Sequence, residues 1–360
     1  MHMADALLSP AVGCTMWAAS AGTIAYCSRK VRLEMDEKKV PLMGVLGAFI
    51  FAAQMINFTI PATGSSGHLG GGLLLAILLG PYAAFLSIAS VLLIQALFFA
   101  DGGLLALGCN IFNLGIFPAF IAYPLIYRPI IGNRPTQGKI VAASMIAAVT
   151  SLQLGAFGVV LETVASGISS LPFATFVTLM QPIHLGIGIV EGLVTAAVVS
   201  FVYKARPEIL QCVTPAQAAA GYSIRNVAIV FLVASLLTGG VISRFASEHP
   251  DGLEWSIQKV TGKEEVEGVK GQLHVLMASL QEKAAFLPDY SFKEPETPKE
   301  VTLHPASAAR IEAADQTSGK QEKDEGNRLG TTVSGILGGL MTLVLAGVTG
   351  FILKKRIGAA

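Results

Sequence analysis

The chain has 360 residues, of which 52% are hydrophobic and only 14% charged, with a formal net charge of +1. Soluble domains carry about 25% charged residues, so this composition excludes an ordinary soluble protein. The near-neutral charge gives no indication of nucleic-acid binding. The four cysteines have no CxxC spacing, which argues against a zinc site or a disulfide framework. The composition therefore predicts an all-α, polytopic membrane protein.

Apolar runs long enough to cross a bilayer recur along the chain. A membrane-spanning helix needs about 20 mostly apolar residues. The candidate spans are residues 11–28, 40–58, 104–127, 140–161, 184–203, 226–242 and 331–353. Region 70–100 is interrupted by Gly80 and Pro81, and it fits either one kinked helix or two shorter ones.

The distribution of Lys and Arg decides between these two arrangements, because short cytoplasmic loops are rich in both residues. Four basic clusters, at 29–39, 128–139, 204–225 and 354–356, fall on one side of the membrane only if region 70–100 crosses twice. The sequence thus predicts about nine transmembrane helices in the cytoplasmic (inner) membrane, in contact with its lipid. The amino terminus is expected outside and the carboxyl terminus in the cytoplasm.

Region 70–100 has about 31 residues, too few for two full spans. Its first helix must therefore be short, and the preceding loop, residues 61–72, is expected to sink into the membrane. Irregular backbone at that depth is tolerated only where it is buried in protein or lines a cavity.

The predicted crossings divide the chain into two regions. Residues 1–215 hold seven, and residues 216–360 hold two that flank an extracytoplasmic segment of about residues 245–329. Within this segment, residues 253–287 show helical periodicity, with apolar residues at alternating steps of three and four (Val266, Val269, Leu273, Leu276 and Leu280). About residues 293–328 are rich in Lys, Glu, Pro, Ala and Ser, which predicts a disordered linker.

His2 is the first candidate metal ligand. The amino terminus has no basic region typical of a signal peptide, and because His2 is large we expect Met1 to be retained with a free α-amine. That amine, the amide that follows it and the imidazole can form a compact chelate. A fourth nitrogen would give a square-planar site, the geometry of Ni(II) and Cu(II). The alternative is that His2 is an arbitrary exposed residue.

His68 is the second candidate, because it lies in the glycine-rich loop GSSGHLGGG that is expected to dip into the membrane. A histidine there needs a polar partner, and the neighbouring glycines allow close backbone approach. Met1, His2 and His68 could together supply four nitrogens. A buried histidine with satisfied hydrogen bonds is the alternative interpretation.

Other polar residues inside the predicted spans form a looser set. His184 and Glu191 are seven residues apart and share a helix face, and an intramembrane carboxylate is a functional candidate. The alternative for these residues is a hydrogen bond between helices, as it is for the amides Gln54, Asn57, Gln95, Asn110 and Asn113. The three histidines of the extracytoplasmic segment, His249, His274 and His304, are expected to be solvated.

Several sequence motifs together carry a family resemblance. They are MHMADALLSP at 1–10, AAQMINF at 52–58, GSSGHLGG at 64–71, DGGLLALGCN at 101–110 and HLGIGIVEGLVT at 184–195. With them, residues 1–205 strongly resemble the cobalt/nickel permeases of energy-coupling-factor transporters, the CbiM/NikM family. Residues 223–353 resemble the small accessory subunit of the same systems, fused in frame, with the motif PDGLEW at 250–255 that is associated with the nickel branch.

The resemblance implies a seven-helix substrate-capture component with no resident cofactor. It implies that Met1 and His2, through the amine, amide and imidazole, hold the ion together with His68. Nickel is the expected cargo and cobalt the alternative. Cytoplasmic ATPase subunits and a transmembrane coupling subunit are the expected partners.

A P-loop motif GxxxxGK[ST] is absent from the sequence, so we expect a transport subunit and not an enzyme. The rival interpretation is a stand-alone, proton-coupled metal transporter with Glu191 as its acid. A membrane enzyme has the least support, because the sequence contains no HExxH motif.

Overall fold

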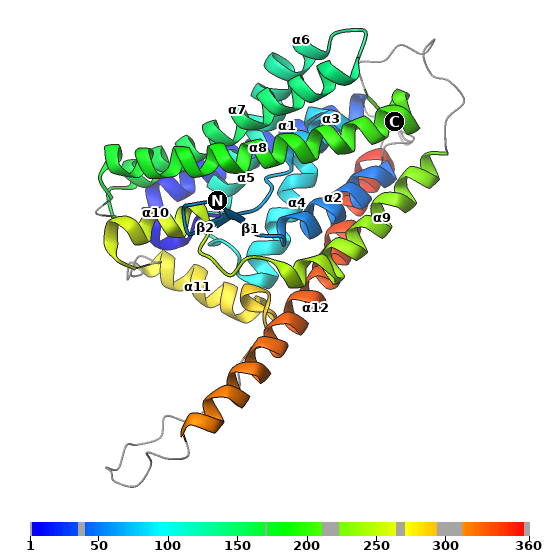
Figure 1. The fold of residues 1–360 in the computed structure, drawn as a ribbon. Helices are drawn as coiled ribbons and strands as arrows, with labels where there is room; N and C mark the ends of the chain where they lie inside the picture. Colours follow the sequence, from blue (N-terminus) through cyan, green and yellow to red (C-terminus); the bar gives the residue numbers. More distant parts are fainter. Residues whose placement is uncertain are drawn as a thin grey trace, which may run out of the picture.

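A computed structural model describes residues 2–34, 40–169, 171–210, 223–263, 271–293 and 312–355. The fold is helical, with one small hairpin (Figure 1). The elements in chain order are η1 (Asp5–Leu7), α1 (Pro10–Glu34), α2 (Val40–Gln54), β1 (Phe58–Ile60), β2 (Ser65–Gly67), α3 (Gly72–Leu79), α4 (Pro81–Phe99), α5 (Leu107–Ile111), η3 (Phe112–Tyr127), α6 (Arg128–Ile131), α7 (Gln137–Ser166), α8 (Phe173–Ala205), η4 (Pro207–Ile209), α9 (Ile224–Gly240), η6 (Ile242–Phe245), α10 (Gly252–Thr261), α11 (Gln272–Ala284), η7 (Pro288–Tyr290) and α12 (Glu312–Lys355).

The prediction of a polytopic helical membrane protein is confirmed. Six segments of the described chain are long and apolar enough to cross a membrane: Pro81–Phe99, Leu107–Ile131, Gln137–Ser166, Phe173–Ala205, Ile224–Phe245 and Leu329–Lys354. Helix α2 is apolar but shorter, while α1 and α3 are not among the candidate spans. The count of nine crossings therefore stays a prediction.

Region 70–100 forms two helices, as the charge pattern predicts. The break falls at Gly80, whose φ of 87° lies in the left-handed region, and Pro81 opens the next helix. Helix α3 has 8 residues, a length of about 12 Å, so the first helix is short. All of its residues are buried, which places α3 inside the protein bundle.

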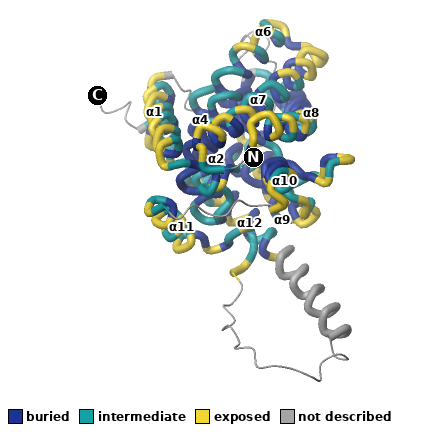
Figure 2. Tube along the Cα trace, turned by 90° about the vertical axis from the view of Figure 1, so that its left-hand side faces the viewer, coloured by how far each residue is buried: buried dark blue, intermediate teal, exposed yellow. Residues whose placement is uncertain are grey.

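Two groups of helices surround this centre (Figure 1). Helices α7 and α8 pack along each other, and α7 also packs against η3, while α2, α9 and α12 pack together on the other side of α4. Between α2 and α12 the backbones approach closely, since a Cβ at Gly44 would lie 2.5 Å from the carbonyl oxygen of Leu343. Figure 2 shows buried residues gathered between these groups and exposed ones along the outer side of α1.

The segment η3 is π-helical over 16 residues and contains Pro118 and Pro124. Proline lacks the backbone N–H that an α-helix needs at these positions. The wider winding carries the chain past both prolines, with Gly115 packed against Phe85 of α4.

The region after α9 agrees with its sequence prediction only in part. The helical periodicity of residues 253–287 corresponds to two helices, α10 and α11, and α10 ends at Thr261, where Gly262 takes a φ of 78°. Leu276 and Leu280 of the predicted apolar stripe are 51% and 47% exposed, while Val266 and Val269 lie outside the described residues. Helix α12 begins at Glu312, so residues 312–328 are helical although their composition predicts disorder; Glu, Ala and Lys are strong helix formers.

Candidate metal site

The amino-terminal segment is inserted between α5 and the loop that follows α4. The Met3 amide donates to Asn110 Oδ1 at 2.8 Å, and the Met3 carbonyl oxygen accepts from the amide of Gly103 at 2.9 Å. The Met3 side chain is completely buried, and Asp5 Oδ1 accepts from the Ala106 amide at 2.9 Å. These bonds fix the backbone that follows His2. Met1, the first residue of the predicted ligand set, lies outside the described residues.

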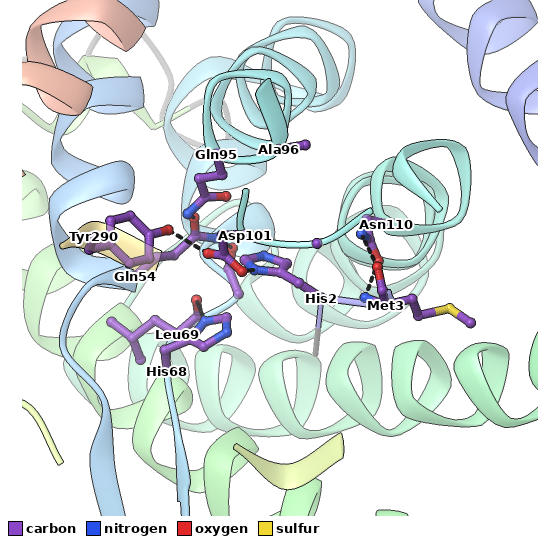
Figure 3. Close-up of polar contacts among 12 residues, drawn as sticks. His2, Met3, Gln54, His68, Leu69, Gln95, Ala96, Asp101, Asn110 and Tyr290 are labelled. Carbon is purple, nitrogen blue, oxygen red and sulfur yellow. Dashed lines mark hydrogen bonds and ion pairs between the residues drawn. The ribbon is translucent and has the colours of Figure 1, made fainter. Parts of the chain in front are cut away.

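The fold brings His2 and His68 together, although 66 positions separate them in the sequence. Their ring centroids are 5.0 Å apart with an interplanar angle of 36°, and Figure 3 shows the two rings near Asp101. The His2 side chain is only 5% exposed. Within the described part of the chain its Nε2 is buried and has no hydrogen-bond partner. His68 Nδ1 lies 3.1 Å from the carbonyl oxygen of Leu69.

Asp101 joins this pair from the loop after α4. Its Oδ1 lies 2.6 Å from His2 Nδ1, and its Oδ2 accepts a hydrogen bond from the hydroxyl of Tyr290 (Figure 3). Burial alone would raise the pKa of Asp101, but the His2 imidazole and the Tyr290 hydroxyl hold that pKa well below its usual value. Burial lowers the pKa of His68 to about 3, so this imidazole is neutral at physiological pH and available as a ligand.

Glu191 anchors the glycine-rich loop that carries His68. Its two carboxyl oxygens accept from the amides of Gly70 at 2.7 Å and Gly71 at 3.1 Å. Gly71 has a φ of 76° and caps α3, a conformation that glycine adopts without steric cost. Gln54 holds the same loop, since its Nε2 donates to the carbonyl oxygen of Gly70 at 2.8 Å. Residues 65–67 and 70–72 of the loop are buried, whereas Pro61, Ala62 and Gly64 are exposed. Only the second half of the predicted sunken loop is therefore buried in protein.

The PDGLEW motif docks on the hairpin β1–β2, whose strands are antiparallel with Thr59 opposite Ser66. Ser66 donates from its amide to the Pro250 carbonyl oxygen at 2.8 Å, and Trp255 Nε1 donates to the Thr63 carbonyl oxygen at 3.0 Å. Asp251 and Glu254 form a capping box on α10, which satisfies its first backbone amides. The motif therefore shapes the wall beside His68.

Two cavities lie beside the histidine pair. One, of about 540 Å³, is lined by His68 and Tyr290 among others, and the second, of about 280 Å³, is lined by His2. Four acidic residues line both cavities: Asp101, Asp251, Glu254 and Asp289. Carboxylate-lined cavities raise the local concentration of cations.

The other predicted candidates serve the structure around the site. Gln95 Nε2 donates to Gln54 Oε1 at 3.0 Å, and Asn110 holds Met3. Asn113 donates to Glu162 at 2.8 Å, and the Asn57 side chain lines the larger cavity. The alternative interpretation of these amides, a hydrogen bond between helices, is therefore the one that fits Gln95 and Asn113.

The histidines outside the pair have varied environments. His184 is buried in α8, with Nδ1 2.8 Å from the Met180 carbonyl oxygen. His249 is exposed as predicted, and His304 lies outside the described residues. The prediction that His274 is solvated is wrong: it is 6% exposed, and its Nε2 lies 2.8 Å from the Leu8 carbonyl oxygen.

The sequence did not identify three residues of the site and its hydrogen-bond network: Asp101, Tyr290 and Glu162. Asp101 precedes two glycines and resembles an ordinary turn residue, and Tyr290 belongs to no motif. In the described chain, no group of three or more His, Cys, Asp or Glu side chains is arranged to hold a metal ion. The predicted set relies on backbone nitrogens for its other donors.

A pair of imidazoles lies beside carboxylate-lined cavities within a bundle of membrane-spanning helices, and this arrangement suits a membrane protein that handles cations. Residues 2–209 match the family described as the cobalt uptake substrate-specific transmembrane region, CbiM, and residues 225–355 match the PDGLE domain. The chain belongs to the CbiM family, with a PDGLE domain fused behind it, as the resemblance in sequence predicts.

Relatives and solved structures agree with this assignment. A protein of Haloquadratum walsbyi named for metal transport is 38% identical over 212 residues, which cover 58% of this chain and 93% of that protein. The fused nickel transport protein NikMN of Rhodobacter capsulatus is 32% identical over 58% of this chain and 64% of its own length. The crystal structure of a truncated transition metal transporter shares 33% identity with a TM-score of 0.50, over 56% of this chain and 98% of that one.

Proposed function

We propose that this chain captures Ni²⁺ on the outer side of the cytoplasmic membrane for import, with Co²⁺ as the alternative cargo. The observation that carries the proposal is the His2–His68 pair, with rings 5.0 Å apart, in a member of the CbiM family. Nickel is favoured over cobalt by the PDGLE domain and by a relative named as a fused nickel transport protein.

The proposed ligands are His2, His68 and the α-amine of Met1, together with the amide nitrogen of His2. A chelate ring that runs from that amide through Cα, Cβ and Cγ to Nδ1 and the metal has six members, whereas Nε2 is too distant to close it. In the described conformation Nδ1 is held by Asp101 at 2.6 Å. Capture by this chelate therefore requires the His2 imidazole to turn so that Nδ1 faces the ion, which leaves Nε2 as the ring nitrogen that Asp101 would hold. Because the amide must lose its proton, affinity should rise with pH.

The carboxylate-lined cavities supply the route by which the ion reaches the pair. A hydrated divalent cation is attracted by Asp101 and the acidic residues of the PDGLE domain. The imidazole and backbone nitrogens then replace its water. Nitrogen donors in a plane suit Ni²⁺ better than an oxygen-rich site would.

The energy for import is proposed to come from partner subunits, cytoplasmic ATPases and a transmembrane coupling subunit, since the sequence has no P-loop. A proton-coupled transporter acting alone would need a free acid within the bundle. Both oxygens of Glu191 instead accept backbone amides, which supports a role as loop anchor. The amino terminus outside and the carboxyl terminus in the cytoplasm fit this arrangement.

Metal-competition binding on the purified full chain tests the proposal. Wild type is expected to bind Ni²⁺ more tightly than Co²⁺. His2→Ala and His68→Ala should each weaken binding by more than about 100-fold, because even outer-shell changes cost 10- to 100-fold. Tyr203→Phe, whose hydroxyl donates to the Pro135 carbonyl oxygen away from the site, is the control variant. One residue added before Met1 should abolish binding; normal Ni²⁺ binding by the extended protein would refute the amino-terminal site.

A further inference from the structure

Tyr290 connects the PDGLE domain to the histidine pair. Its hydroxyl donates to Asp101 Oδ2, and the other oxygen of the same carboxylate lies 2.6 Å from His2 Nδ1. Figure 3 shows the three side chains in a row. One end of this row belongs to the part of the chain that matches the PDGLE domain, and the other belongs to the metal-uptake part.

Packing holds the Tyr290 ring in place. The ring stacks on Phe99 of α4, with centroids 5.2 Å apart and an interplanar angle of 22°, and meets Phe51 of α2 edge-on at 6.4 Å. The backbone turns sharply to put it there: Asp289 and Tyr290 have φ of 48° and 59°. Residues other than glycine rarely take such values, and they cluster at functional sites when they do.

The segment before Tyr290 holds the loop that carries Asp101. Gln281 of α11 donates from Nε2 to the carbonyl oxygens of Ala96 at 2.9 Å and Gly102 at 2.7 Å. The Leu287 amide donates to the carbonyl oxygen of Phe98 at 3.3 Å. The PDGLE domain therefore fixes both the backbone around Asp101 and its carboxylate.

A histidine that binds a metal through one ring nitrogen needs a partner at the other, and that partner sets the orientation of the ring. Asp101 provides the carboxylate nearest to His2 among the described residues. With Nδ1 on the ion, Asp101 would hold the ring through Nε2. The carboxylate can orient the ring only if it is itself held, and the Tyr290 hydroxyl does this on the side away from His2.

We propose that Tyr290 is a positioning residue for the metal site, which acts on His2 through Asp101. The PDGLE domain then contributes to the affinity of the site itself. This inference rests on the proposed function, because it requires that His2 bind the metal.

The test is a double-mutant cycle on the purified full chain, with Ni²⁺ affinity as the readout. Tyr290→Phe keeps the ring and its stacking and deletes only the hydroxyl. We expect its affinity for Ni²⁺ to fall about 10-fold, the effect of losing an outer-shell partner. Tyr203→Phe is the matched control, since that hydroxyl donates to the carbonyl oxygen of Pro135 at 3.1 Å, away from the site.

The cycle is completed with Asp101→Ala. If Tyr290 acts through Asp101, Tyr290→Phe should have less than a twofold effect in the Asp101→Ala background. A full 10-fold effect there would mean that Tyr290 acts by another route and would overturn the proposal, as would a Tyr290→Phe affinity equal to that of Tyr203→Phe. If wild type itself fails to bind Ni²⁺, the proposed function has failed, which is a distinguishable result.

Discussion

The contact between Glu191 and the glycine-rich loop gives the most direct prediction. Glu191→Gln keeps the size of the side chain but replaces one acceptor oxygen with an NH₂ donor. The two loop amides, of Gly70 at 2.7 Å and Gly71 at 3.1 Å, then face one acceptor and one donor. One backbone N–H is left unsatisfied in a buried site.

The size of the effect follows from these two bonds. An unsatisfied buried donor costs about 1–3 kcal/mol, and weakening the surviving bond adds about 1 kcal/mol. A total of about 3 kcal/mol corresponds to roughly a 100-fold change in an equilibrium constant. The loop should therefore open roughly 100-fold more often.

Hydrogen exchange measures this opening directly. A peptide that covers residues 64–75 should exchange up to roughly 100-fold faster in Glu191→Gln, while peptides from α7 stay unchanged. The matched control is Glu162→Gln, because Glu162 accepts from Asn113 at 2.8 Å and does not contact the loop. Exchange in Glu191→Gln equal to that of wild type, or an equal increase in both variants, would refute the anchoring role.

Three further predictions concern the PDGLEW motif beside His68 and the pH dependence of the free energy of unfolding. Gly252→Ala should weaken docking of α10, because the added Cβ would lie 2.6 Å from Ile183 Cγ2 and 3.1 Å from His184 Cε1; faster proteolysis between residues 245 and 263 would show this. Trp255→Phe deletes the bond to the Thr63 carbonyl oxygen and should lower the free energy of unfolding by about 1 kcal/mol, measured by denaturant titration. Burial lowers the pKa of His68 to about 3 in the folded protein. As the pH falls, His68 is therefore protonated in the unfolded chain at a higher pH than in the folded protein, which favours unfolding. The metal-free protein should then lose up to about 1.4 kcal/mol per pH unit between pH 6.5 and 3, and thermal unfolding of His68→Gln should show a shallower slope.

The helical membrane architecture could be predicted because it depends on local properties. Runs of apolar residues and the distribution of Lys and Arg can be read from the sequence alone, and Gly80-Pro81 marks the break between α3 and α4. The shortness of α3 followed from counting residues. Of the linker predicted at about residues 293–328, residues 294–311 lie outside the described residues, so that part stays a prediction. Residues 312–328 are helical, because low hydrophobicity does not prevent helix formation by Glu, Ala and Lys.

The candidate site could be predicted only in part. His2 and His68 stand in distinctive local sequences, and the structure brings them together. Asp101 and Tyr290 could not be found in this way, because the contact between them joins residues 189 positions apart. His274 was assigned to solvent for the same reason, since its partner is the Leu8 carbonyl oxygen, 266 positions away. No local pattern encodes such a contact.

The long separations in the Tyr290–Asp101–His2 row also bear on biosynthesis. The His2–Asp101 contact spans 99 residues and the Asp101–Tyr290 contact spans 189. A chain emerging from the ribosome therefore has His2 and His68 long before it has Tyr290. During most of its synthesis and membrane insertion, the growing chain therefore lacks the complete row. If Tyr290 positions His2 as proposed, metal binding at full strength requires the finished polypeptide, and a prematurely terminated product that ends before the PDGLE domain would bind its ion more weakly.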